Sequence, residues 1–151
     1  ASFVAVYDAC VLHPAALRDL LLHLALLRLF RARWTDRIHD EWIQSLSGRL
    51  ARTRARMNAA VPDALVTGYD GLIDQVVLLE VLEPYGIDAQ HPDAFVVHLI
   101  DLDAASVCAA VRNQRASLLN PPYSAGELLD TFRSLELATT VAALEPMQDL
   151  L

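Results

Sequence analysis

The chain opens with an apolar run, Phe3–Tyr7, which ends at the carboxylate of Asp8. An uninterrupted apolar run of this length predicts a central strand that is buried on both faces of a parallel sheet. Pro14 suits the first turn of a helix, where its missing N–H costs nothing. We expect this helix to reach about Arg31. Its buried stripe is predicted at Leu17, Leu20, Leu21, Leu24 and Leu27.

A second helix is predicted from an N-cap at Thr35 to about Leu46. Its apolar face is formed by Ile38, Trp42 and Leu46. At about 3.6 residues per turn, Glu41 lies at the rim of this face, whereas Asp40 points to water. Glu41 is therefore the better placed of the two carboxylates to face another element.

The rest of the chain favours helices. Arg49–Ala60 has a helical pattern, and a short strand is expected at Ala64–Thr67. Asp93 and Asp103 are suited to cap two further helices, the second reaching about Leu118. The remaining expectations are a capping box formed by Ser124 and Glu127, a short helix Thr140–Leu144, and a frayed tail Glu145–Leu151.

These elements predict a helix-rich α/β protein: three layers, α/β/α, with a small, mostly parallel sheet and a C-terminal helical extension. With 151 residues and 54% apolar composition, the chain suits a globular protein with a full core. We divide it into a domain at residues 1–101 and a helical extension at 102–151 packed on it.

Composition narrows the function classes. The net charge is −7, and all 12 basic residues are arginines. That charge argues against broad electrostatic capture of nucleic acid, so any such contact must be local. Cys10 and Cys108 are too few for a disulfide framework, which favours a cytoplasmic protein with reduced thiols. The most hydrophobic segment, Leu20–Phe30, is too short to span a membrane. We therefore do not expect the protein to associate with a membrane.

Motifs for other chemistries are missing from the sequence. The five histidines show neither HxH nor HxxxH spacing, which argues against a zinc site. A Gly-rich phosphate loop is also missing, so nucleotide hydrolysis of the P-loop kind is not expected. Asp8 has two interpretations at this point: a functional carboxylate at the end of a strand, or only the cap of the following helix.

Four blocks of the chain together resemble a bacterial subfamily of PIN-domain proteins, which includes the VapC-like toxins of toxin–antitoxin pairs. The blocks are YDACVLHPAALRDLLLHLA, RWTDRIHDEWIQSL, MNAAVPDALVTGYDGLI and LEPYGIDAQHPDAFV. Because that family consists of metal-dependent ribonucleases, the resemblance implies an acidic cluster that holds one or two Mg²⁺ or Mn²⁺ ions. Asp8 matches its first Asp and Glu41 its helical Glu, and both are implied as metal ligands and catalytic residues.

The chain departs from this family between Val76 and Glu80. The family carries further acidic residues on a segment that should lie here, and the flanking blocks are instead fused. Either these residues are absent from the sequence in hand but belong to the protein, or the protein is a deletion variant. A separation well above about 3.8 Å between consecutive Cα atoms at 76–80 would indicate missing residues.

The resemblance therefore implies an endoribonuclease toxin with an RNA substrate and a cognate antitoxin; a homodimer is left open. Arg52 and Arg56 share a helical face with Arg49 and are candidates for a local RNA contact. A solvated surface is the alternative interpretation of these arginines. The alternative function is a catalytically inactive PIN-like module that binds a protein partner, because two carboxylates alone hold a divalent ion poorly.

Overall fold

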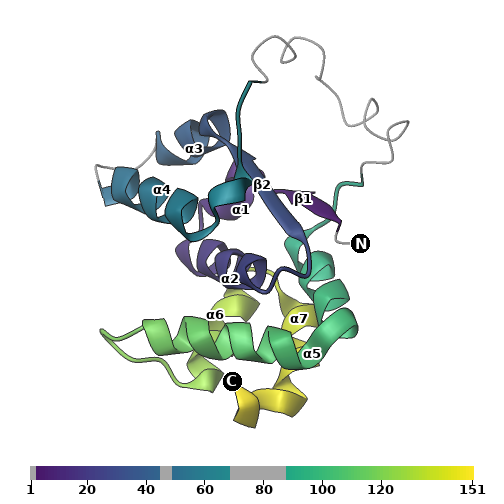
Figure 1. Ribbon diagram of the computed structural model, residues 1–151. Coiled ribbons are helices and arrows are strands. Elements are labelled where there is room, and N and C mark those ends of the chain that lie inside the picture. The colour runs from purple at the N-terminus through teal and green to yellow at the C-terminus, as the bar shows by residue number, and fades with distance from the viewer. Residues whose placement is uncertain (1–2, 45–48, 69–87) are drawn as a thin grey trace.

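A computed structural model describes residues 3–44, 49–68 and 88–151 (Figure 1). Three strands form a small sheet: β1 (Val4–Val6), β2 (Arg31–Thr35) and β3 (Leu65–Val66). Their order is β1-β2-β3, and both pairings are parallel. The helix-rich α/β class with a small parallel sheet is thereby confirmed, and so is the short strand expected near Ala64–Thr67.

The helices occupy most of the described chain (Figure 1). Those of the first part are α1 (Ala9–Leu12), α2 (Ala15–Leu26), α3 (Asp36–Ile43) and α4 (Arg49–Ala60), followed by the single turn η1 (Pro62–Ala64). The C-terminal region consists of α5 (Pro92–Ser117), α6 (Ala125–Ser134), α7 (Ala138–Leu144) and the 3₁₀ segment η5 (Glu145–Leu150). Helix α2 lies between the two groups and packs against both α4 and α5.

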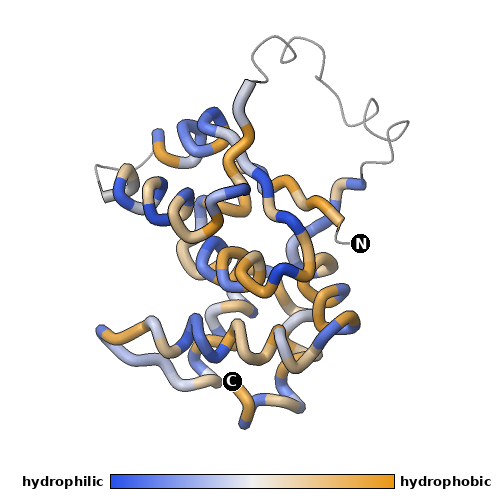
Figure 2. The backbone as a smooth tube through the Cα atoms, viewed as in Figure 1, coloured by the Kyte–Doolittle hydropathy of each residue, from blue (hydrophilic) through white to orange (hydrophobic). Residues whose placement is uncertain are grey.

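The described helices cover one face of the sheet. Ala32 and Trp34 point into the core and are 2% and 0% exposed, whereas Val4 and Val6 on β1 are 56% and 68% exposed. The expectation that Phe3–Tyr7 is buried on both faces is therefore wrong. In register, Val4 and Val6 lie beside two arginines of β2, and no described helix covers this face. In Figure 2, β1 is a short segment coloured as hydrophobic.

The first long helix is shorter than predicted. It ends at Leu26, and the chain reverses through Arg28, whose φ is 59°. The residues that follow, Arg31–Thr35, form β2 rather than the end of that helix. Alternation explains the strand: Ala32 and Trp34 turn inward, and the arginines between them turn outward. The apolar stripe is confirmed at Leu17, Leu20, Leu21 and Leu24, which are all buried.

Capping chemistry positions the C-terminal helices. Asp103, with φ −158°, interrupts α5 and accepts a hydrogen bond from the Ser106 N–H at 3.0 Å, as a cap should. The capping box of Ser124 and Glu127 is also present. Asp93 differs from the prediction: His91 caps α5, because its Nδ1 accepts from the Asp93 N–H.

Asp93 instead joins two helices. Its carboxylate accepts from the main-chain N–H groups of Thr139 and Thr140, at 3.0 and 2.7 Å, at the start of α7. The tail is also packed rather than frayed. Leu151 is 3% exposed, and the Arg115 side chain donates to its carbonyl at 2.7 Å. The elements α6, α7 and η5 thus pack against α5.

The fusion predicted at Val76–Glu80 lies outside the described residues. The division at residues 101 and 102 falls inside α5, close to its interruption at Asp103. By length and composition α5 could cross a membrane, but a core helix passes the same test, and eight of its residues are buried in the protein.

Candidate functional site

Asp8 lies two residues beyond the end of β1, at the edge where parallel strands carry functional groups. It occupies the N-cap position of α1, yet its side chain makes no capping hydrogen bond, so capping alone does not account for it. The Asp8 carboxylate is exposed and accepts a hydrogen bond from the Cys10 thiol at 3.0 Å. This hydrogen bond, with partial burial, raises the pKa of Cys10. Asp8 therefore presents oxygen atoms to solvent.

Glu41 lies on α3, which begins directly after β2 at the same edge of the sheet. Thr35 caps this helix as predicted and accepts from the Ile38 N–H at 3.1 Å. Glu41 is exposed, whereas the next residue, Trp42, is 1% exposed. Because α1 and α3 pack against each other, the helices that carry Asp8 and Glu41 are neighbours.

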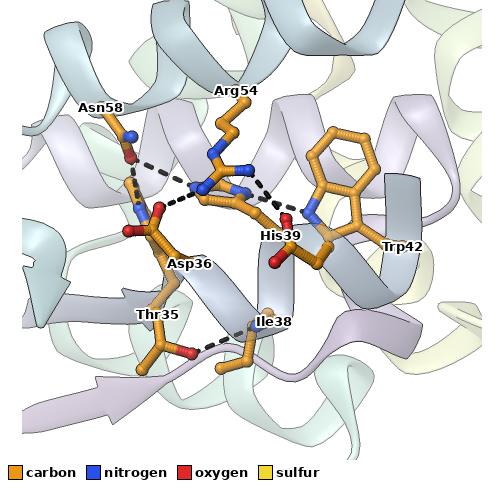
Figure 3. A network of polar contacts seen from close by, with 9 residues as sticks. Thr35, Asp36, Ile38, His39, Trp42, Arg54 and Asn58 are labelled. Atoms are coloured by element: carbon orange, nitrogen blue, oxygen red, sulfur yellow. Dashed lines mark hydrogen bonds and ion pairs between the residues drawn. The ribbon is translucent and has the colours of Figure 1, made fainter. Parts of the chain in front are cut away.

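Two other carboxylates of α3 are already engaged. Arg54 of α4 donates to Asp40 at 2.8 Å and also pairs with Asp36 (Figure 3). Asp40 was expected to be only a solvated charge; it is exposed but belongs to this bridge between helices. A single guanidinium is thus shared by both carboxylates. Within the described part of the chain, Glu41 is the carboxylate of α3 that makes no ion pair.

A buried polar network beneath α3 was not foreseen from the sequence (Figure 3). His39 is fully buried and receives a hydrogen bond at Nδ1 from the Trp42 Nε1–H, at 3.1 Å. Its Nε2 lies 3.2 Å from Asn58 Oδ1, which also accepts from the Trp34 Nε1–H at 2.8 Å. Asn58 thus connects α4 with both β2 and α3.

The donors in this network determine the state of the histidine. An indole N–H can only donate, so Nδ1 of His39 must be the acceptor and Nε2 carries the proton toward Asn58. Burial lowers the pKa of His39, which agrees with a neutral ring. The signal in the sequence was weak, because a histidine at one helical position says little without its partners from β2 and α4.

The arginines of α4 separate as predicted. Arg52 and Arg56 are exposed, and Arg54 turns away from them toward α3. The side chain of Arg49, the third arginine assigned to that face, lies outside the described residues. Among the described residues, neither Arg52 nor Arg56 forms an ion pair, which is what either a local RNA contact or a solvated face requires.

The donor set at this edge suits a hard divalent ion only in part. Asp8 and Glu41 offer carboxylate oxygens, and Mg²⁺ commonly takes one or two carboxylates with water and substrate oxygens completing its shell. Among residues 3–44, 49–68 and 88–151, however, no cluster of three or more His, Cys, Asp or Glu side chains forms a metal cage.

Comparison with known proteins links the other end of the chain to a family. Neither a curated protein nor a solved structure matches this sequence. Residues 92–146, from the first residue of α5 to the start of η5, match the family described as the VapC50 C-terminal domain. The C-terminal part of the chain is thus similar to a domain of VapC-type toxins, as the resemblance of the N-terminal blocks suggested.

Proposed function

We propose that this protein is a metal-dependent endoribonuclease of the PIN type and the toxin of a toxin–antitoxin pair. The observation that carries the proposal is the placement of Asp8 and Glu41. Both are exposed carboxylates: Asp8 directly precedes α1, Glu41 lies on α3, and these two helices pack together. The match of residues 92–146 to the VapC50 C-terminal domain supports the toxin assignment independently of these side chains.

The proposed cofactor is Mg²⁺ or Mn²⁺, held by Asp8 and Glu41. A bound divalent ion would activate water and neutralise charge on the phosphodiester. The Asp8 and Glu41 carboxylates would orient the ion toward the substrate. Arg54 pairs with both Asp36 and Asp40, which offsets part of their repulsion of an RNA backbone near α3.

Replacement of the strand-end carboxylate tests the proposal. We expect Asp8→Asn to abolish Mn²⁺-dependent RNA cleavage and growth toxicity without unfolding the protein, because the amide removes an anionic ligand at an exposed position. Asp101→Asn, at an exposed position on α5, is the matched control and should cleave RNA like the wild type. Full cleavage by Asp8→Asn would refute the assignment.

The substrate contact is proposed at Arg52 and Arg56. Replacing both by Ala should weaken RNA binding and flatten its dependence on salt, since fewer counterions are then released. Arg112→Ala removes an exposed arginine from α5 and serves as the control. Unchanged RNA binding in the double variant would leave these residues as a solvated face.

An inactive module that binds a protein partner is the second candidate. Two observations on the described residues favour it: Val4 and Val6 are exposed on the sheet, and no cluster of three or more potential metal ligands is present among them. Calorimetry with Mn²⁺ separates the candidates, because only the nuclease should bind the ion tightly. The toxin proposal also implies a cognate antitoxin as partner, and co-purification from cells expressing both genes of the pair would test that.

A further inference from the structure

Arg18 of α2 is a buried cation at the junction of three helices. The residue is 7% exposed. Its Nη1 donates to the main-chain carbonyl of Leu12, the last residue of α1, at 2.8 Å. The guanidinium carbon also lies 4.9 Å from the centre of the Trp42 ring on α3, within the range of a cation–π interaction.

These two contacts compensate the buried charge of Arg18 only in part. No carboxylate of the described residues forms an ion pair with Arg18, and its Nε has no hydrogen-bond partner there. Burial lowers the pKa of Arg18, and the charge of neighbouring Asp19 offsets this only in part. Since an incompletely paired buried charge costs free energy, an unbranched apolar side chain would serve folding at least as well.

Each contact of the guanidinium is made with a helix that lies next to, or contains, one of the two candidate ligands. Leu12 ends the short helix that begins after Asp8, and Trp42 directly follows Glu41 on α3. One rigid, planar group therefore touches both helices that carry a carboxylate. We infer that Arg18 is a positioning residue, which holds α1 and α3 in the relation that lets Asp8 and Glu41 bind one ion; this inference rests on the proposed function.

The test compares stability with metal affinity in one variant. Arg18→Met keeps an unbranched stem and removes the fork and the charge. We expect its midpoint of urea unfolding to equal or exceed that of the wild type, whereas its affinity for Mn²⁺, measured by calorimetry on the full chain, falls about tenfold or more. A merely structural arginine would not separate these two readouts.

Arg115→Met is the matched control, because Arg115 also donates to main-chain carbonyls, but in the C-terminal region. It should leave Mn²⁺ affinity unchanged. Wild-type Mn²⁺ affinity in Arg18→Met would overturn the inference. Loss of the fold in Arg18→Met would overturn it as well, because the arginine would then be needed by the core itself.

A second readout separates failure of this inference from failure of the proposed function. Spin labels on the exposed Cys10 of α1 and on an Arg37→Cys variant of α3 report the relation of the two helices without metal. We expect Arg18→Met to broaden their distance distribution. If the wild type does not bind Mn²⁺, the proposed function is refuted. The distances between the labels would then decide by themselves whether Arg18 positions α1 and α3. A distance distribution that is unchanged in Arg18→Met overturns the inference.

Discussion

Asn58 gives the sharpest test of how α3 is held, because a single oxygen accepts two buried donors. Replacing Asn58 by Ala removes the partner of the Trp34 indole N–H, at 2.8 Å, and of the His39 ring N–H, at 3.2 Å. A buried donor left without an acceptor costs about 1–3 kcal/mol. Because Asn58 is half-buried, water can reach part of the space, and we expect a total loss of about 2–4 kcal/mol.

Urea unfolding followed by tryptophan fluorescence measures this loss directly. The protein has two tryptophans, Trp34 and Trp42, and both belong to the network. A lower midpoint at an unchanged slope would report stability rather than a change in the unfolded state. The loss would be large against the roughly 5–15 kcal/mol that stabilises a typical domain.

Asn58→Asp is the matched control, since a carboxylate oxygen can accept both hydrogen bonds. It should retain most of the stability at a pH above the usual range of histidine. Two outcomes would refute the reasoning: a loss below about 0.5 kcal/mol in Asn58→Ala, the range of ordinary surface substitutions, or an equal loss in both variants.

Two further predictions concern the same folded framework. Burial lowers the pKa of His39 in the folded state. As the pH falls, this histidine is therefore protonated in the unfolded chain before it is protonated in the folded protein. The melting temperature should then fall as the pH drops below about 6.5. His39→Gln should flatten this profile, and an unchanged profile would contradict it; His98→Gln, at an exposed site, is the control. Asp93→Ala removes the acceptor of two N–H groups at the start of α7 and should cost about 1–2 kcal/mol in urea unfolding. A stability equal to that of the wild type would show that water replaces this cap.

Local signals identified several elements before any fold was known. Thr35 caps α3, Asp103 caps the second part of α5, and Ser124 with Glu127 forms the capping box of α6. Each depends on a side chain and a main-chain group within three residues of it, so the sequence itself contains both partners. The buried stripe of α2 follows in the same way from helical spacing.

Strand β2 was not predicted from the sequence, for a different reason. Its alternation of arginine with Ala32 and Trp34 is a strand signal, but the leucine-rich stretch before it favours continuing the helix. Arg28, at φ 59°, ends that stretch instead, and pairing with β1 stabilises the strand. The exposure of Val4 and Val6 likewise depends on which elements cover β1, which an apolar run does not specify.

For the candidate site, the sequence determined the residue types and their place: a carboxylate after the first strand and another on the helix that Thr35 caps. Only the tertiary structure determined which side chains from other elements surround them. Arg54 forms ion pairs with Asp36 and Asp40. Asn58 lies within hydrogen-bonding distance of His39, which is 19 positions away in the sequence. Arg18 contacts both α1 and α3. These partners are distant in sequence and meet only because the helices pack, so no local pattern could reveal them.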